Sequence, residues 1–125
     1  MSNRVVLALA VLLLIATTAS AGEWAYRIQP ARPELMTNPS KEEMAAVGAH
    51  WERLKELFAK GTVVFAGRTT KAEGEVFGVV VFRAENEEAA RAIMNGDPAV
   101  QKGVMKATLF PFSIAPRTRK PRAPS

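Results

Sequence analysis

Few side chains in this chain could perform chemistry, and the first of them is its single histidine, His50. An imidazole can act as a general base or acid near neutral pH. A histidine that borders the apolar face of a helix is more often structural, so the residue alone leaves both interpretations open. The second candidate is Asp97, which precedes Pro98 after Asn-Gly at 95–96. At such a position an aspartate commonly caps a turn, and the proline takes the first helical position.

Composition excludes several other kinds of site. The 125-residue chain has no cysteine, which removes disulfides, thiol nucleophiles and cysteine-based zinc sites. With one histidine and no cluster at metal-ligand spacing, we expect no metal and no cofactor. The carboxylates of region 41–60 alternate with cations, which is typical of a solvated helix face.

The first 21 residues have the pattern of a cleavable signal peptide. Arg4 precedes an apolar run over 5–16, which is shorter than the roughly 20 residues that cross a bilayer. Small residues at 19–21 fit the specificity of signal peptidase, so we expect cleavage before Gly22. We therefore predict an exported, periplasmic or secreted protein, with no stable membrane insertion after cleavage. An uncleaved membrane anchor is the alternative.

The net charge of +5 arises outside the expected domain at 22–115. Within that range 12 cations balance 12 carboxylates; the remaining cations are Arg4, Arg117, Arg119, Lys120 and Arg122. Binding to nucleic acid depends on a basic surface, so we expect no nucleic-acid partner for a neutral domain. Residues 116–125 read as a disordered basic Pro/Arg tail.

Alternating helix and strand patterns predict how the candidate residues are positioned. Strand patterns cover 23–29, 62–67, 76–83 and 105–114, and helical patterns cover 40–60 and 87–94. Ser40 and Glu43 form a capping box for the first helix, which Gly61 ends, and Asn86 caps the second. The order βαββαβ predicts an α+β, ferredoxin-like fold, with a four-stranded antiparallel sheet and two helices on one face.

Apolar side chains recur at helical spacing in the first helix and predict a single stripe toward the core. The stripe comprises Met44, Val47, Trp51, Leu54 and Phe58. His50 is expected near the edge of this stripe.

The strand at 76–83 is apolar on both sides, since Val79 and Val81 point one way while Val80 and Phe82 point the other. Two helices cover only one face of the sheet, so the other face needs a further partner. We predict a second copy that packs sheet to sheet, as an isologous homodimer.

Several segments, in this order and spacing, resemble the YCII-related domain family. They are His-Trp-Glu-Arg-Leu at 50–54, Gly-Thr-Val-Val-Phe-Ala-Gly at 61–67, Glu-Ala-Ala-Arg-Ala at 88–92, Asn-Gly-Asp-Pro at 95–98, Gly103 and Leu-Phe-Pro-Phe at 109–112. The resemblance spans 24–115 and implies a dimeric α/β barrel of ferredoxin-like subunits. It also implies that the helix histidine and the aspartate of the Asp-Pro turn, here His50 and Asp97, form the active-site pair.

The resemblance leads to a functional hypothesis, because the family includes a dehydrochlorinase that acts on a chlorinated hydroxyhydroquinone. A carboxylate that holds one imidazole nitrogen raises the basicity of the other. We therefore hypothesise a small lyase or isomerase, with His50 as base and acid and Asp97 as orienting partner, acting on a small cyclic or enolisable substrate.

Two other hypotheses remain open. One is a non-catalytic dimeric module that binds a small apolar or aromatic ligand in the same pocket, between helix and sheet. The residues expected to line that pocket are Trp24, Tyr26, Trp51 and Phe65. The other is a dimerisation unit that presents the basic tail.

Overall fold

The computed structural model describes residues 22–71 and 74–116. The elements follow in the order β1 (Gly22–Pro30), a 3-10 helix η1 (Pro33–Met36), α1 (Lys41–Ala59), β2 (Val63–Arg68), β3 (Gly78–Ala84), α2 (Glu87–Asn95), a short α3 (Pro98–Gln101) and β4 (Met105–Pro111). The expected signal peptide and most of the expected tail lie outside the described residues.

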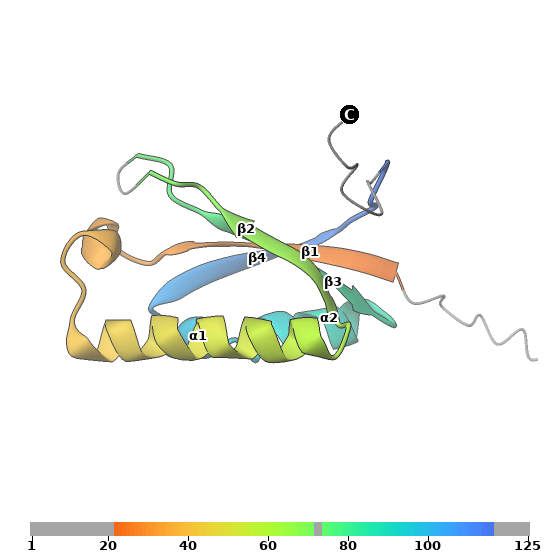
Figure 1. The fold of residues 1–125 in the computed structure, drawn as a ribbon, viewed down its shortest axis with the longest axis horizontal. Helices are drawn as coiled ribbons and strands as arrows, with labels where there is room; N and C mark the ends of the chain where they lie inside the picture. The colour runs from red at the N-terminus through yellow and green to blue at the C-terminus, as the bar shows by residue number, and fades with distance from the viewer. Residues whose placement is uncertain (1–21, 72–73, 117–125) are drawn as a thin grey trace, which may run out of the picture.

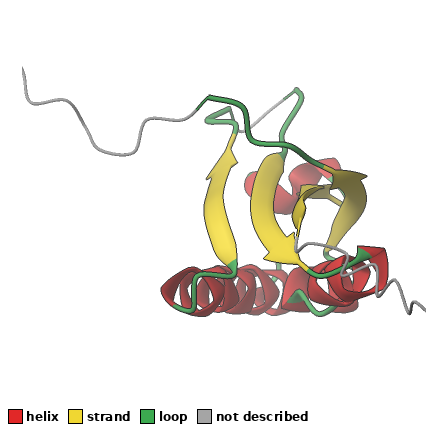
Figure 2. Ribbon diagram, turned by 90° about the vertical axis from the view of Figure 1, so that its right-hand side faces the viewer, coloured by secondary structure: helices red, strands yellow, loops and turns green. Residues whose placement is uncertain are grey.

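The four strands form one antiparallel sheet in the order β2-β3-β1-β4. Helices α1 and α2 lie on the same face of this sheet, below the strands in Figure 1, and Figure 2 shows the two layers from the side. The predicted α+β, ferredoxin-like fold is therefore confirmed. The last strand ends at Pro111, earlier than expected, although the Phe112 N–H still donates to the Glu23 carbonyl at 3.2 Å.

Local signals at the ends of α1 act as predicted. Ser40 Oγ accepts from the Glu43 backbone N–H at 3.1 Å, and Glu43 Oε1 accepts from the Ser40 N–H at 2.9 Å. Gly61 follows the helix with a φ of 78°, in the left-handed region that suits glycine. The Thr62 N–H then bonds back to the Leu57 carbonyl at 2.9 Å, which closes the last turn before β2 begins.

The core lies between the sheet and the two helices. Its buried strand residues alternate along β1 and β3, as predicted, and are Tyr26, Ile28, Val80, Phe82 and Ala84. Leu54 of α1 with Ala90 and Met94 of α2 completes the cluster. The Tyr26 and Phe82 rings meet edge to face, with centroids 5.7 Å apart, so Tyr26 is held rigidly at the centre of the sheet.

Helix α1 turns a different face to the sheet than its large apolar side chains predict. Ala46 and Leu54 are buried, and His50 lies one turn from each of them. Three members of the predicted stripe are exposed instead, namely Met44, Trp51 and Phe58. The prediction of one core-facing stripe was therefore wrong for these three residues.

Polar contacts explain the rotation of α1. His50 is joined to Asp97, and Arg53 Nη1 donates to the Ile93 carbonyl at 2.8 Å. Both bonds tie the same side of α1 to the segment at the end of α2. Ala46 is buried on this side of α1, and its small side chain counts for little in a pattern judged by large apolar residues.

The outer face of the sheet carries a row of paired residues across all four strands. Phe65 pairs with Val81, Val81 with Ala25, and Ala25 with Phe110. Val81 and Ala25 are buried within one chain, whereas Phe65 and Phe110 on the edge strands are 47% and 45% exposed. The outer face is thus apolar at its middle, with aromatic side chains open at both edges.

Candidate active site

Asp97 is the only buried charged side chain in the described part of the chain, at 1% exposure. It follows the end of α2 and caps α3, where its Oδ1 accepts from the Ala99 backbone N–H at 3.0 Å and Pro98 begins the helix. This is the capping role that the Asp-Pro pattern predicts. The cap uses one carboxylate oxygen, so the other is left for partners from elsewhere in the fold.

The second oxygen, Oδ2, has two side-chain partners. His50 Nδ1 lies 2.5 Å from it, and the Tyr26 hydroxyl donates to it at 2.8 Å. Burial by itself would raise the pKa of Asp97, but the hydrogen bond and charge of His50, with the bonds from Tyr26 and the Ala99 N–H, hold that pKa below its ordinary value. Asp97 is therefore an ionised carboxylate near neutral pH.

An ionised partner decides which nitrogen of His50 carries the proton. The carboxylate can only accept, so Nδ1 must donate, and Nε2 of the neutral ring is left with a lone pair. The His50 side chain is 13% exposed and lines a pocket, whereas Asp97 lies behind the ring. The arrangement presents one basic nitrogen to a small ligand.

Tyr26 lies beneath this pair and not in the pocket. Its ring is fully buried, and its pKa is raised well above the ordinary tyrosine value, first by burial and then by the charge of Asp97 and the hydrogen bond to it. Tyr26 stays protonated at any working pH and so remains a donor to Asp97. Tyr26 was predicted to line the pocket, but its hydroxyl supports the carboxylate from beneath instead.

Arg53 fixes the segment that carries Asp97. Its guanidinium lies against Gly96, where an added Cβ would come within 2.7 Å of Nη2, and it donates to the Ile93 carbonyl. Arg53 and His50 lie about one turn apart on α1. The helix is therefore bonded at two points to the end of α2 and the residues after it, through Ile93 and Asp97. Nothing in the local sequence pattern signalled this role.

The pocket beside His50 has a volume of about 470 Å³ and lies between α1 and the β2–β3 pair. Its lining is mostly apolar, with Trp51 and Leu54 from α1, Ile28 from β1 and Val80 from β3. Arg68 at the end of β2 is the other ionisable side chain of the lining. A pocket of this size and character suits a small ligand with a flat apolar body.

The other two expected pocket residues do not line it. Trp24 lies near the far end of β1, paired with Phe82 and Pro111, and its buried indole N–H has no partner among the described residues. Phe65 points to the outer face of the sheet. Of the four residues expected to line the pocket, the structure brings only Trp51 to it.

A register shift in β2 explains why Phe65 points away from the pocket and why Arg68, which was not predicted to line it, points toward it. The pairing of β2 with β3 shifts between Val63 and Phe65. Simple alternation from the buried Val63 would point Phe65 inward and Arg68 outward. One extra residue reverses the two faces, so Phe65 points outward and Arg68 inward.

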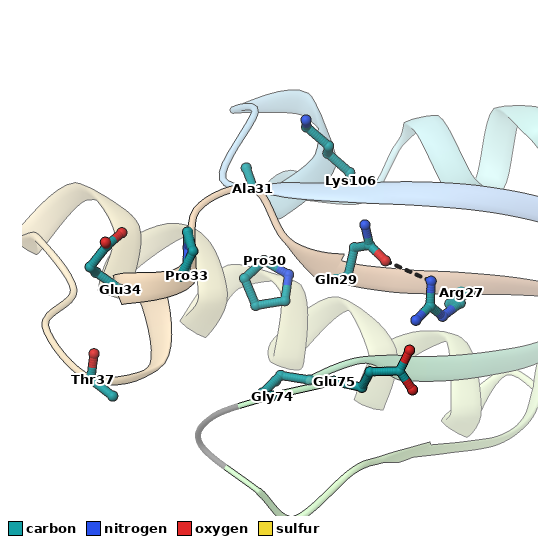
Figure 3. Close-up of a pocket in the computed structure, with 11 residues that line it drawn as sticks. Arg27, Gln29, Pro30, Ala31, Pro33, Glu34, Thr37, Gly74, Glu75 and Lys106 are labelled. Carbon is teal, nitrogen blue, oxygen red and sulfur yellow. Dashed lines mark hydrogen bonds between the residues drawn. The ribbon is translucent and has the colours of Figure 1, made fainter.

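A larger cavity of about 760 Å³ lies at the Pro30 end of β1, without His50 or Asp97 (Figure 3). Its lining mixes the cations Arg27 and Lys106 with the carboxylates Glu34 and Glu75. It therefore contains no histidine that could act as a base, and its charges are of both signs. The chemistry points to the smaller pocket, although the other is larger.

Within residues 22–71 and 74–116, no group of three or more His, Cys, Asp or Glu side chains is placed to hold a metal ion. No helix in the same part of the chain combines the length and the hydropathy needed to cross a bilayer.

The fold and the pair together define a ferredoxin-like α+β domain with a buried histidine–aspartate site. The profile of the YCII-related domain family matches residues 14–113, and the chain belongs to this family. The resemblance seen in the sequence is thereby confirmed.

Among solved structures, the chain is similar to the 5-chloro-2-hydroxyhydroquinone dehydrochlorinase from Burkholderia phenoliruptrix AC1100, solved in complex with 2,5-dihydroxybenzoquinone. The TM-score is 0.54 at 15% identity, and the match covers 72% of this chain and 93% of that one. At this identity the likeness shows the shared fold. No curated protein sequence matches the chain.

Proposed function

We propose that this protein is a small-molecule lyase or isomerase that uses His50 and Asp97 for general acid–base chemistry. The observation that carries the proposal is the 2.5 Å approach of His50 Nδ1 to the buried Asp97 carboxylate, on a ring that lines a small apolar pocket. Two partners hold this geometry: Tyr26 supports the carboxylate, and the α3 cap fixes its other oxygen.

The chemistry follows from the tautomer. Nε2 of His50 accepts a proton from an acidic C–H or O–H of a small cyclic or enolisable substrate, and the Asp97 carboxylate stabilises the imidazolium that forms. In an elimination a leaving group departs, whereas in an isomerisation the imidazolium returns the proton at another atom. Such positioned proton transfer contributes about 10² to 10⁴ in rate.

The structural neighbour supports this reaction class. Its name describes a dehydrochlorinase, an enzyme that removes the elements of HCl, and its bound ligand is a flat six-membered ring. The pocket beside His50 has the volume and the apolar walls for a ring of that kind. We therefore propose hydroxylated, halogenated six-membered rings as the first substrates to assay.

The test measures chloride release from 5-chloro-2-hydroxyhydroquinone and from related halogenated hydroquinones. We expect turnover by the wild type and a loss of about 10² to 10⁴ in His50→Gln. The matched control is Glu52→Gln, an exposed residue of the same helix whose ion pair with Lys55 is on the surface. Full turnover by His50→Gln on an accepted substrate would show that the base assignment is wrong.

The mostly apolar lining also favours a second candidate, a non-catalytic module that binds a small aromatic ligand. Binding of 2,5-dihydroxybenzoquinone separates the two functions. A binding module retains its affinity in His50→Gln and turns over no member of the panel. An enzyme shows turnover that this variant loses.

We further propose that the active form is a homodimer through the outer face of the sheet. The open aromatic side chains of Phe65 and Phe110, at the two ends of the row described above, support this arrangement. Export through cleavage before Gly22 is also part of the proposal. N-terminal sequencing of the protein recovered from outside the cytoplasm tests it, and an intact Met1 terminus there would contradict it.

A further inference from the structure

The register of β2 turns a cation toward the helix side of the sheet. Beyond the shift, Ala66 pairs with Val80 and Arg68 pairs with Gly78, and Val80 belongs to the core cluster under the helices. Arg68 therefore projects toward α1. It is exposed to solvent and lines the pocket that holds His50, so its place is at the open side of that pocket.

No carboxylate lines this pocket, and the ionisable side chains of its lining are His50 and Arg68. Among the described residues, none of the ion pairs involves Arg68. Two arginines elsewhere in the fold have such partners: Arg32 pairs with Glu43, and Arg53 bonds to the Ile93 carbonyl. Within the described residues, the apolar lining thus holds a cation without a carboxylate partner.

Gly78, the residue opposite Arg68, also lines the pocket. An added Cβ there would meet the Gly67 carbonyl oxygen and Ile28 Cγ2, each at 3.2 Å, so the strands pack closely beside Arg68. Trp51 lines the same pocket, and an aromatic side chain favours contact with a planar ring.

We infer that the pocket binds a planar apolar molecule that carries an anionic oxygen group, with Arg68 as the residue that recognises the anion. A guanidinium binds carboxylate or phenolate oxygens through charge-assisted hydrogen bonds. The inference rests on the proposed function only in placing the reacting part of the molecule at His50. The recognition of the anion depends only on the position of Arg68 in the pocket lining.

The experiment uses matched anionic and neutral probes. The purified full chain is titrated with 2-naphthoate and with its neutral counterpart 2-naphthamide, followed by calorimetry. A parallel pair, 4-nitrophenol above its pKa and 4-nitroanisole, distinguishes phenolate from carboxylate as the preferred anion. We expect the wild type to bind the anion of at least one pair about 10-fold or more tighter than its neutral partner.

Arg68→Gln should remove that preference, with about 10-fold weaker binding of the anion and nearly unchanged binding of the neutral probe. The control is Arg83→Gln, which changes an exposed arginine of the neighbouring strand β3 and should retain the preference. Arg68 is exposed, so its variant is expected to fold, and an unchanged melting temperature verifies this.

Equal affinity for both members of each pair in the wild type would overturn the inference, as would a preference that survives in Arg68→Gln. Absence of measurable binding by any probe at millimolar concentration would overturn it as well. His50→Gln separates the two proposals, because it should retain the anion preference while losing turnover. A preference that depends on Arg68, with turnover indifferent to His50, would sustain this inference and reject the proposed function.

Discussion

The Tyr26 hydroxyl donates to Asp97 Oδ2 at 2.8 Å, across 71 positions of sequence. The same oxygen faces His50 Nδ1, so the central strand β1, the end of α2 and helix α1 meet at one carboxylate. The core beneath the pocket therefore holds the orientation of the histidine. The site depends on the packing of the whole domain and not on a loop.

Tyr26→Phe should weaken this support without opening a cavity. The loss of one donor raises the pKa of Asp97 toward its ordinary value and lowers the free energy of unfolding by about 1 to 3 kcal/mol. Urea denaturation and the pH dependence of turnover measure the two effects. Trp24→Phe is the control, since that aromatic lies on the same strand without contact to Asp97. Unchanged stability and an unchanged pH profile would show that the hydroxyl contributes nothing.

Asp97→Asn should lower turnover by about 10² to 10⁴, close to the effect of His50→Gln. An amide no longer fixes the tautomer that leaves Nε2 basic, and it cannot stabilise an imidazolium by charge. Steady-state kinetics and the nitrogen chemical shifts of the His50 ring test this. The circular dichroism spectrum should remain that of the wild type. Wild-type turnover with a reversed tautomer would contradict the mechanism.

Acid should destabilise the wild type partly through Asp97. Its folded-state pKa lies below the ordinary aspartate value of 3.8, because the hydrogen bonds and the charge of His50 outweigh burial. The unfolded state therefore binds the proton first, so the stabilisation is present above about pH 4 and is lost as pH falls through the folded pKa. The difference in unfolding free energy between wild type and Asp97→Asn should shrink from pH 6 to pH 3. A constant difference would contradict this assignment.

The same experiment needs a second carboxylate as a comparison. Hydrogen bonds from Arg32 hold the pKa of Glu43 to about 2, so Glu43 also contributes to acid sensitivity. Glu43→Gln should lower the melting temperature at pH 6, with the difference from the wild type shrinking as pH falls from about 4.5 toward 2. Turnover should be unaffected, since Glu43 is not part of the pocket lining.

Gly78→Ala should reduce both ligand binding and stability. Its Cβ would meet Gly67 O and Ile28 Cγ2 at 3.2 Å, so these neighbours must give by a few tenths of an ångström, at a cost of about 1 kcal/mol. Gly67→Ala is the matched control, because a Cβ there has nothing within 4 Å. That control should be neutral or slightly stabilising, since alanine loses less backbone entropy on folding. Equal effects of the two variants would contradict the close packing at Gly78.

Phe65→Lys and Phe110→Lys should each convert the proposed dimer into a monomer. A lysine at either end of the outer row would place a charge in an apolar interface. Light scattering after size exclusion at micromolar concentration measures the change. Phe58→Lys, on the opposite side of the domain on α1, should leave the dimer intact. A monomeric wild type under these conditions would refute the sheet-face dimer.

The order of the four strands and two long helices, the caps of those helices and the alternation in β1 and β3 were all predictable, because each depends on neighbouring residues. Ser40 with Glu43, Gly61 and Asn86 act where the sequence places them. His50 and Asp97 were candidates from their residue types, and the family resemblance paired them. The distance between their side chains could not be predicted.

Local spacing and capping were enough to predict the four strands, the two long helices and the family. Contacts between distant residues set which face of α1 is buried, place Tyr26 beneath Asp97, and point Phe65 outward and Arg68 inward. A helix rotation and a register shift are chosen by contacts between residues far apart in the chain. The register shift in β2 puts Arg68 instead of Phe65 at the site, and local sequence patterns do not predict it.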